Sequence, residues 1–152
     1  AAIDALAAAP GEGWLVLGDM RELGTEGVAL HAAAGRRASA AKLQRLYALG
    51  DLSAVAAQAF GEGGRVFATH EALIDALQAD LAEAAGRETR LPQHTSAKTQ
   101  EHAVIQQQQS PSTAMLSGAA SITILVKGSR GSAMDRVVTA LLASAQGASH
   151  AT

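Results

Sequence analysis

The sequence contains no cysteine, few aromatic residues and little net charge, and each of these absences excludes a class of protein. Without cysteine there is no disulfide framework, no thiol nucleophile and no cysteine-based metal site. A formal net charge of -2 gives no reason to expect nucleic acid or an acidic membrane surface as a partner. No apolar run approaches the roughly 20 residues that a membrane-spanning helix needs, so we expect no membrane insertion and a cytoplasmic protein.

Several motifs that carry chemistry are also missing. There is no G-x-x-x-x-G-K-[ST] loop, so the chain has no recognisable P-loop for a nucleoside triphosphate. The five histidines show no paired spacing typical of zinc ligands, and we predict no metal site. We expect His31 to be exposed or half-buried in a helix and His70 to lie in the first turn of another. No G-x-S-x-G elbow surrounds Ser129, and we assign no catalytic residue.

The residues that are present suffice for one domain of ordinary size. Hydrophobic residues make up 48% of the 152 residues, but many are alanine and aromatics are only 3%. We therefore expect a core of Leu, Val, Ile and closely packed Ala rather than of large rings. A chain of this length buries roughly 70% of the surface that its unfolded form exposes. Because it begins with Ala inside an apparent helix, we expect it to be a piece of something longer.

Strand and helix patterns alternate along the chain. Apolar runs of strand length occur at 14–18, 45–49, 65–68 and 122–126, and helix patterns at 1–9, 25–42, 51–60, 69–86 and 133–142. Candidate helix caps are Thr25, Asp51 or Ser53, Thr69 and Ser132. This alternation predicts an α/β fold, a Rossmann-like three-layer sandwich with a mainly parallel sheet. In such a sheet the functional loops lie at the carboxyl ends of the strands.

One segment does not fit this alternation. About 35 residues separate the helix that ends near 85 from the strand at 122, whereas connections in compact α/β proteins have ~2–6 residues. The segment contains a glutamine tract and a Ser-Pro-Ser-Thr run, which are typical of low complexity. We therefore predict a domain at 1–147 with a low-complexity insert near 87–119, and a frayed tail at 148–152. The insert is either a partner-binding or regulatory segment or a surface insertion without a role.

The turn after the last predicted strand is a candidate anion site. Gly128 and Gly131 allow a sharp turn between a strand and a helix, where free N–H groups and the positive end of the helix dipole point at one spot. Lys127 and Arg130 add two cations there. Alternatively, the glycines only form a tight turn and both cations are solvated.

The helix after this turn has a clear predicted start and core-facing side. Ser132 and Asp135 match the Ser-x-x-acid capping pattern, which predicts that the helix begins at Ala133. Its apolar residues recur at helical spacing and predict one buried stripe, made of Met134, Val137, Val138, Leu141 and Leu142.

The loop after the first predicted strand is a second candidate site. Asp19 and Glu22 follow the first predicted strand, a position that often carries function, although a solvated acidic loop is an alternative. We predict that this loop and the turn at 127–130 come together at one rim of the sheet.

The motifs of these loops, taken together, resemble the C-terminal domain of the Mur ligases. The resemblance covers roughly 1–85 and 120–145 and is carried by WLVLGDMRELG (14–24), His31, LYALG (46–50), VKGSR (126–130) and MDRVV (134–138). It is strongest to the members that join D-alanyl-D-alanine to UDP-N-acetylmuramoyl-tripeptide in peptidoglycan synthesis. The insert departs from the family pattern, in which we expect a short loop.

The resemblance implies a function shared among three domains of one enzyme. An N-terminal domain holds the UDP-sugar, a central P-loop domain binds ATP and Mg2+, and the C-terminal domain receives the incoming amino acid or dipeptide and closes over the nucleotide. The acceptor carboxylate becomes an acyl phosphate, which the incoming amine attacks. The implied partners are D-alanyl-D-alanine, UDP-N-acetylmuramoyl-tripeptide and the other two domains. ATP and Mg2+ are implied for the full-length enzyme and no cofactor for this chain alone, which we expect to be inactive by itself.

The same resemblance implies a substrate-binding surface made by the two loops, consisting of Asp19, Glu22, Lys127, Gly128, Ser129 and Arg130. The cationic turn would meet a phosphate or the dipeptide carboxylate, and the two acids would engage the amine or orient Lys127. Two rival interpretations stay open at this point. One is a stand-alone Rossmann-like module that binds a small anion or nucleotide without catalysis, and the other is a structural fragment with no retained function.

Overall fold

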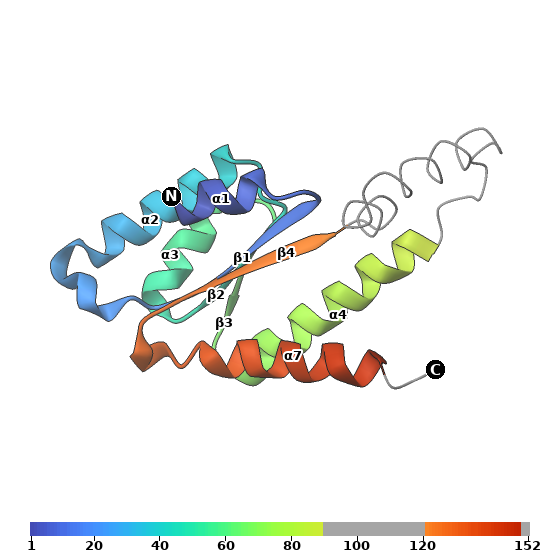
Figure 1. Cartoon of the computed structure of the whole chain (residues 1–152). Helices are drawn as coiled ribbons and strands as arrows, with labels where there is room; N and C mark the ends of the chain where they lie inside the picture. The colour runs from blue at the N-terminus through green and yellow to red at the C-terminus, as the bar shows by residue number, and fades with distance from the viewer. Residues whose placement is uncertain (90–120, 150–152) are drawn as a thin grey trace.

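The computed structural model describes residues 1–89 and 121–149, which form a four-stranded sheet with helices on both faces (Figure 1). In chain order the elements are α1 (Ala2–Ala8), β1 (Glu12–Gly18), the 3-10 helix η1 (Arg21–Glu26), α2 (Gly27–Ala40), β2 (Arg45–Leu49), α3 (Asp51–Phe60), β3 (Gly64–Phe67), α4 (His70–Thr89), β4 (Ile122–Lys127), the 3-10 helix η2 (Arg130–Ser132) and α7 (Asp135–Ser149). All strand pairs are parallel, in the order β3-β2-β1-β4. The predicted three-layer, Rossmann-like α/β fold is confirmed.

The ends of two helices differ from the predicted boundaries. Helix α4 continues to Thr89, past the predicted end near residue 86, so the first residues of the predicted insert are helical. From residue 90 to 119 that insert lies outside the described residues. Helix α7 continues to Ser149, and residues 150–152 of the predicted tail also lie outside them. None of the helices in the described ranges is long and apolar enough to cross a bilayer.

The sheet separates two cores of different composition. In Figure 1, α1, α2 and α3 lie on one side of the sheet and α4 and α7 on the other. The first core is built mainly of Leu and Ala, as predicted: Leu6, Leu15, Leu17, Ala38, Leu43, Leu46, Ala48, Ala56, Ala57 and Phe60. The second contains Trp14, Val16, Tyr47, Leu49, Leu73, Leu77, Met134 and Val137. The rings of Trp14 and Tyr47 are fully buried with centroids 5.9 Å apart, so the prediction of a core without large rings is wrong for this face.

Helices α2 and α3 cross at a glycine. Gly35 of α2 is buried, and a Cβ built on it would clash with the backbone carbonyl oxygen of Ala56 in α3. The two helices therefore approach as closely as their backbones allow, which only glycine permits at this position. This contact fixes the position of α3, whose first turn lies at the carboxyl ends of the strands.

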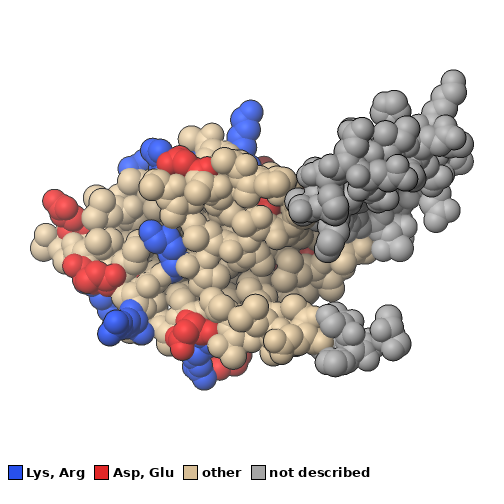
Figure 2. Space-filling view, in the orientation of Figure 1, with Lys and Arg blue, Asp and Glu red and all other residues tan. Residues whose placement is uncertain are grey.

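A charged cluster ties α4 to the neighbouring strands. The Asp80 carboxylate accepts a hydrogen bond from the Tyr47 hydroxyl at 2.7 Å and is 2.9 Å from Nη1 of Arg65 and 3.2 Å from Nη1 of Arg45. Burial of the phenol, and then its hydrogen bond to Asp80, raises the pKa of Tyr47 above its ordinary value. Two cations compensate the buried carboxylate, as a buried charge requires. Elsewhere, positive and negative side chains are interspersed on the face shown in Figure 2.

The predicted N-cap residue is correct for α4 and wrong for α2. Thr69 caps α4, because its Oγ1 accepts the N–H of Ala72 at 3.2 Å, and this prediction is confirmed. Thr25 does not cap α2, whose N-cap is Glu26 without a side-chain hydrogen bond. The reason is that residues 21–26 already form η1, with a kink at Gly24 (φ 58, ψ -139), so the chain enters α2 from a helical turn.

Candidate functional site

The sheet topology singles out the carboxyl ends of β1 and β4. Strands β1, β2 and β3 follow one another outward through α2 and α3 on one face, whereas α4 on the other face returns the chain to β4, on the far side of β1. The strand order therefore reverses between β1 and β4. In open parallel sheets, ligands bind in the crevice at the carboxyl side of such a switch point.

The loops that follow β1 and β4 are in direct contact. Ser129 donates two hydrogen bonds to the carbonyl oxygen of Asp19, one from its backbone N–H at 3.2 Å and one from its hydroxyl at 2.8 Å. Gly18 and Gly128 make this approach possible, because a Cβ on Gly128 would lie 3.3 Å from the Gly18 Cα and 2.7 Å from the Cγ of Met134. The predicted meeting of the two loops at one rim is thus confirmed.

The turn after β4 is built differently from the predicted capping box. The Ser132 hydroxyl donates to the carbonyl oxygen of Ser129 at 2.6 Å and so closes η2. Ala133 follows in the left-handed region (φ 48, ψ 42), which interrupts the helix, and α7 begins at Asp135. The prediction that Ser132 starts a helix at Ala133 is therefore wrong, because its hydroxyl bonds backward into the turn.

The stripe of α7 that faces the core is narrower than predicted. Met134 and Val137 are buried and Leu141 packs against the second core, as expected. Val138 and Leu142 are 39% and 59% exposed, respectively, so the predicted burial is wrong for both. Val137 and Leu141 lie four residues apart and face the sheet, whereas Val138 and Leu142 each lie one position further round the helix, toward solvent.

Asp19 is buried and serves the neighbouring helix. Its Oδ1 accepts the backbone N–H of Ser53 at 2.8 Å, and the residue is only 7% exposed. The N-cap residue of α3 is Gly50, with φ 108, which has no side chain to accept that N–H. Asp19 thus performs the capping role from the adjacent loop, and its negative charge lies at the positive end of α3. The predicted cap of α3 at Asp51 or Ser53 is therefore wrong. The alternative that Asp19 is solvated is also wrong, whereas Glu22 is exposed on η1.

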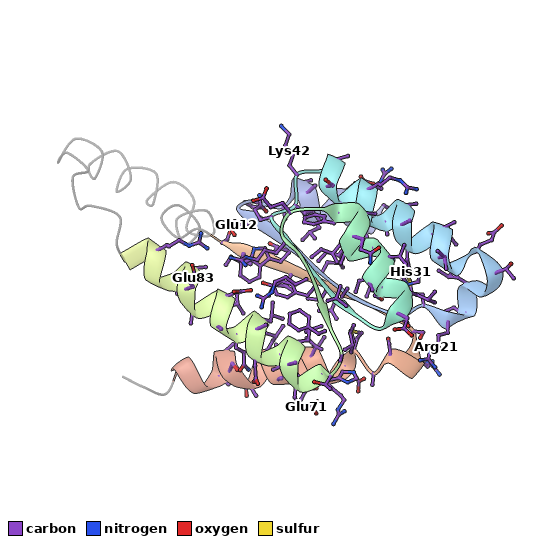
Figure 3. All side chains as sticks on the ribbon, turned by 180° about the vertical axis from the view of Figure 1, so that it is seen from behind. Glu12, Arg21, His31, Lys42, Glu71 and Glu83 are labelled. Carbon is purple, nitrogen blue, oxygen red and sulfur yellow. The ribbon has the colours of Figure 1, made fainter. Side chains whose placement is uncertain are left out.

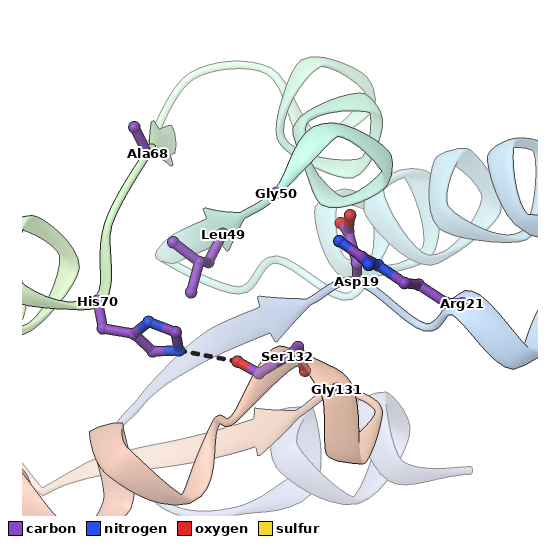
Figure 4. A pocket seen from close by; sticks show the side chains of 8 residues that line it. All are labelled: Asp19, Arg21, Leu49, Gly50, Ala68, His70, Gly131 and Ser132. Carbon is purple, nitrogen blue, oxygen red and sulfur yellow. Dashed lines mark hydrogen bonds between the residues drawn. The ribbon is translucent and has the colours of Figure 1, made fainter.

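A pocket of about 170 Å³ opens at this rim (Figure 4). It is lined by Asp19, Arg21, Leu49, Gly50, Ala68, His70, Gly131 and Ser132. His70 is the first residue of α4, as predicted, and its Nε2 lies 2.8 Å from the carbonyl oxygen of Ser132, which joins α4 to η2 across the pocket. No local sequence pattern predicts this contact, because its partners are 62 positions apart.

The other predicted site residues lie around this pocket rather than in it. Gly128, Ser129 and Arg130 line a shallow depression together with Met134 and Asp135. Lys127 is exposed and lines a separate pocket of about 120 Å³ beside α1 and α2, with Leu15, Leu17 and Met20 among its walls. The structure therefore brings Asp19 and Ser129 together but places Lys127 on the α1–α2 side of the sheet.

His31 supports the loop after β1. Its ring is fully buried between α2 and that loop, so the expected exposure is wrong (Figure 3). Nδ1 lies 2.6 Å from the carbonyl oxygen of Gly27, and Nε2 is 3.3 Å from the backbone nitrogen of Met20. Both bonds are satisfied when Nδ1 carries the proton and Nε2 accepts the Met20 N–H. This histidine thus holds the residue next to Asp19.

The described residues contain no cluster of three or more His, Asp or Glu side chains that could hold a metal ion. The rim instead carries the guanidinium groups of Arg21 and Arg130, which suit a ligand with negative charge, while the Asp19 carboxylate suits a cationic group. The rim thus presents groups of both charges.

The chain is similar in sequence to part of a known ligase. No family model matches the chain. The chain is 37% identical, over 141 residues, to UDP-N-acetylmuramoyl-tripeptide–D-alanyl-D-alanine ligase of Escherichia coli (strain K12). The match covers 93% of this chain but only 23% of that ligase, so the chain spans less than a quarter of the length of its relative. The resemblance to the Mur ligases predicted from the sequence is confirmed: the chain is similar to the C-terminal domain of this ligase.

Proposed function

We propose that this chain is the dipeptide-receiving domain of an ATP-dependent ligase that joins D-alanyl-D-alanine to UDP-N-acetylmuramoyl-tripeptide in the cytoplasm, during peptidoglycan synthesis. The sequence similarity supports the class of enzyme. The observation that carries the proposal for this domain is the bond between Ser129 and Asp19, which joins the two loops at the switch point of the sheet.

The proposed ligand, a dipeptide, carries an ammonium group and a carboxylate at opposite ends. Asp19 lines the pocket with a carboxylate, which attracts an ammonium group. Arg130 lies on the adjoining loop, and its guanidinium attracts a carboxylate or phosphate. We assign the amine to Asp19 and Glu22 and the negative group to residues 127–130, with Lys127 contributing from the α1–α2 side of the sheet.

The reaction itself involves domains that this chain does not contain. In the proposal, ATP with Mg2+ supplies the phosphoryl group that activates the acceptor carboxyl, in a domain with a P-loop. The amine of the dipeptide then attacks the acyl phosphate, so that the new C–N bond forms, the C–O bond to phosphate breaks and the amine loses a proton. This chain's contribution is to hold and orient the dipeptide. We expect no ligation by the chain alone.

The first test uses the full-length ligase that carries this domain. Arg130→Ala and Lys127→Ala should each raise the Michaelis constant for D-alanyl-D-alanine about tenfold, because each removes a charge-assisted contact worth ~1.5–3 kcal/mol. Arg36→Ala, which removes an exposed cation from α2, is the matched control and should leave that constant unchanged. Unchanged Michaelis constants and turnover in the first two variants would remove these residues from the site.

The second test uses this chain and its backbone amide chemical shifts. Adding D-alanyl-D-alanine should shift the amides near Asp19 and Ser129, whereas ATP alone should shift few of them. A response to ATP without a response to the dipeptide would favour a small-anion or nucleotide-binding module. No response to either ligand would contradict the proposed site.

A further inference from the structure

The hydroxyl of Ser53 is a buried polar group without a visible role. Ser53 is fully buried, and its Oγ has no hydrogen-bond partner among residues 1–89 and 121–149. Burying a hydroxyl without a partner costs free energy, and alanine would fill the same place without that cost. The hydroxyl therefore destabilises the ligand-free fold, and we look for its role in the ligand-bound state.

Ser53 lies next to the Asp19 carboxylate, which we propose as the group that binds the incoming amine. It is the third residue of α3, and its backbone N–H is the donor that holds Oδ1 of Asp19 at 2.8 Å. In two of the three staggered χ1 rotamers, a serine hydroxyl lies gauche to its own backbone nitrogen. The Ser53 hydroxyl can therefore lie on the side of its own N–H group, toward the carboxylate that this N–H already binds.

The Asp19 carboxylate has little freedom to move away. It is packed against Gly50, where a Cβ would lie 2.5 Å from its Cγ and Oδ1 and 2.6 Å from its Oδ2. Because Gly50 has φ 108, a conformation that L side chains rarely adopt, the backbone at this place is suited to leaving room for the carboxylate. Any adjustment to a ligand must therefore come from the donors around Asp19 rather than from a large movement of the acid.

We propose that Ser53 is a positioning residue for the amine of the dipeptide. Its N–H holds Oδ1 of Asp19 at all times, and its hydroxyl turns to donate a second hydrogen bond to the carboxylate when the ammonium group binds at the pocket. Hydrogen bonds to an ionised acceptor are about twice as strong as neutral ones, so this second donor holds the Asp19 carboxylate more firmly in one orientation. The inference rests on the proposed function, since it needs Asp19 to receive the amine.

The test compares three variants of Ser53 in the full-length ligase. Ser53→Ala should raise the Michaelis constant for D-alanyl-D-alanine about tenfold and leave those for ATP and for the acceptor unchanged, while resistance to urea stays equal or increases. Ser53→Cys, whose thiol is a weak donor, should behave in the same way. Ser53→Thr keeps the donor but adds a methyl group to a filled site, so it should lower stability and retain a Michaelis constant near that of the wild type. Ser39→Ala, on the exposed side of α2, is the control and should change none of these constants.

The outcomes separate this inference from the one on which it rests. If the wild-type ligase does not use D-alanyl-D-alanine, the proposed function is overturned and the role of Ser53 falls with it. If the wild type is active and Ser53→Ala has an unchanged Michaelis constant for the dipeptide, only the role of Ser53 is overturned. A Ser53→Ala variant that is clearly less resistant to urea would also overturn it, because its hydroxyl would then be bonded in the resting fold.

Discussion

Adding one methyl group at Gly35 should destabilise the chain, although the same change normally stabilises a helix. Replacing an interior helical glycine by alanine gains about 1 kcal/mol from helix propensity. At Gly35, however, the new Cβ would overlap the Ala56 carbonyl oxygen and lie 2.9 Å from the Ala56 carbonyl carbon. All of the atoms it meets belong to the backbone, so no side chain can rotate away and α3 itself must shift.

The expected change in the free energy of unfolding is the difference between these two effects. Overpacking a core costs about 1–3 kcal/mol, and a clash with backbone belongs at the upper end of that range. After subtracting the gain of about 1 kcal/mol in propensity, Gly35→Ala should lower the free energy of unfolding by about 2 kcal/mol. For a chain of this length that corresponds to a fall of about 4–8 °C in melting temperature.

Gly86 provides a matched control in another helix. It lies in α4, is exposed, and a Cβ there would meet no atom within 4 Å. Gly86→Ala should therefore raise the free energy of unfolding by about 0.5–1 kcal/mol. Urea denaturation of the chain measures both variants, provided that the slope with denaturant is unchanged. If Gly35→Ala proved neutral or stabilising, the close approach of α2 and α3, and the position of α3 derived from it, would be wrong.

Three further substitutions test other parts of the structure. Lys42→Gly should raise the free energy of unfolding by about 1 kcal/mol in urea denaturation, because Lys42 ends α2 in the left-handed conformation (φ 60) that glycine adopts without cost. Tyr47→Phe should lower it by about 1–2 kcal/mol through loss of the hydrogen bond to Asp80. Since the pKa of Tyr47 is raised in the folded chain, its contribution is complete below about pH 10 and is lost as the pH rises further, so the alkaline fall in stability should be smaller in Tyr47→Phe than in the wild type. His31→Leu should cost about 2 kcal/mol and speed hydrogen exchange at the Met20 amide, because that buried N–H loses its acceptor; unchanged exchange would contradict the bridging role.

The parts of the structure that the sequence predicted are those encoded by local patterns. The apolar run before Gly18 and the run before Gly128 are strands because β-branched and large apolar residues suit a sheet covered on both faces. Once both strands are parallel neighbours, the loops after them meet at one rim, and the contact between Asp19 and Ser129 follows from the topology. The cap at Thr69 was likewise visible, because its partner lies three residues away.

The features that the sequence did not reveal depend on partners far apart in the chain. Asp19 caps α3 across 34 positions, whereas the local pattern points to Asp51 or Ser53. His31 is buried because of its contact with Met20, which no helical periodicity encodes. At Ser132 two local bonds compete, and the backward bond to Ser129 wins over a helix cap.

Because α3 is capped by Asp19 from a different loop, the stability of its first turn depends on ligand binding at the rim. Because the Ser53 N–H stays bonded to the Asp19 carboxylate while that carboxylate receives a guest, binding of the guest should hold the first turn of α3 more firmly. By thermodynamic reciprocity, a change that tightens or loosens that turn must alter how readily Asp19 accepts a guest. Occupancy of the pocket is thus measurable from the opening of amides in a helix that the guest itself need never touch.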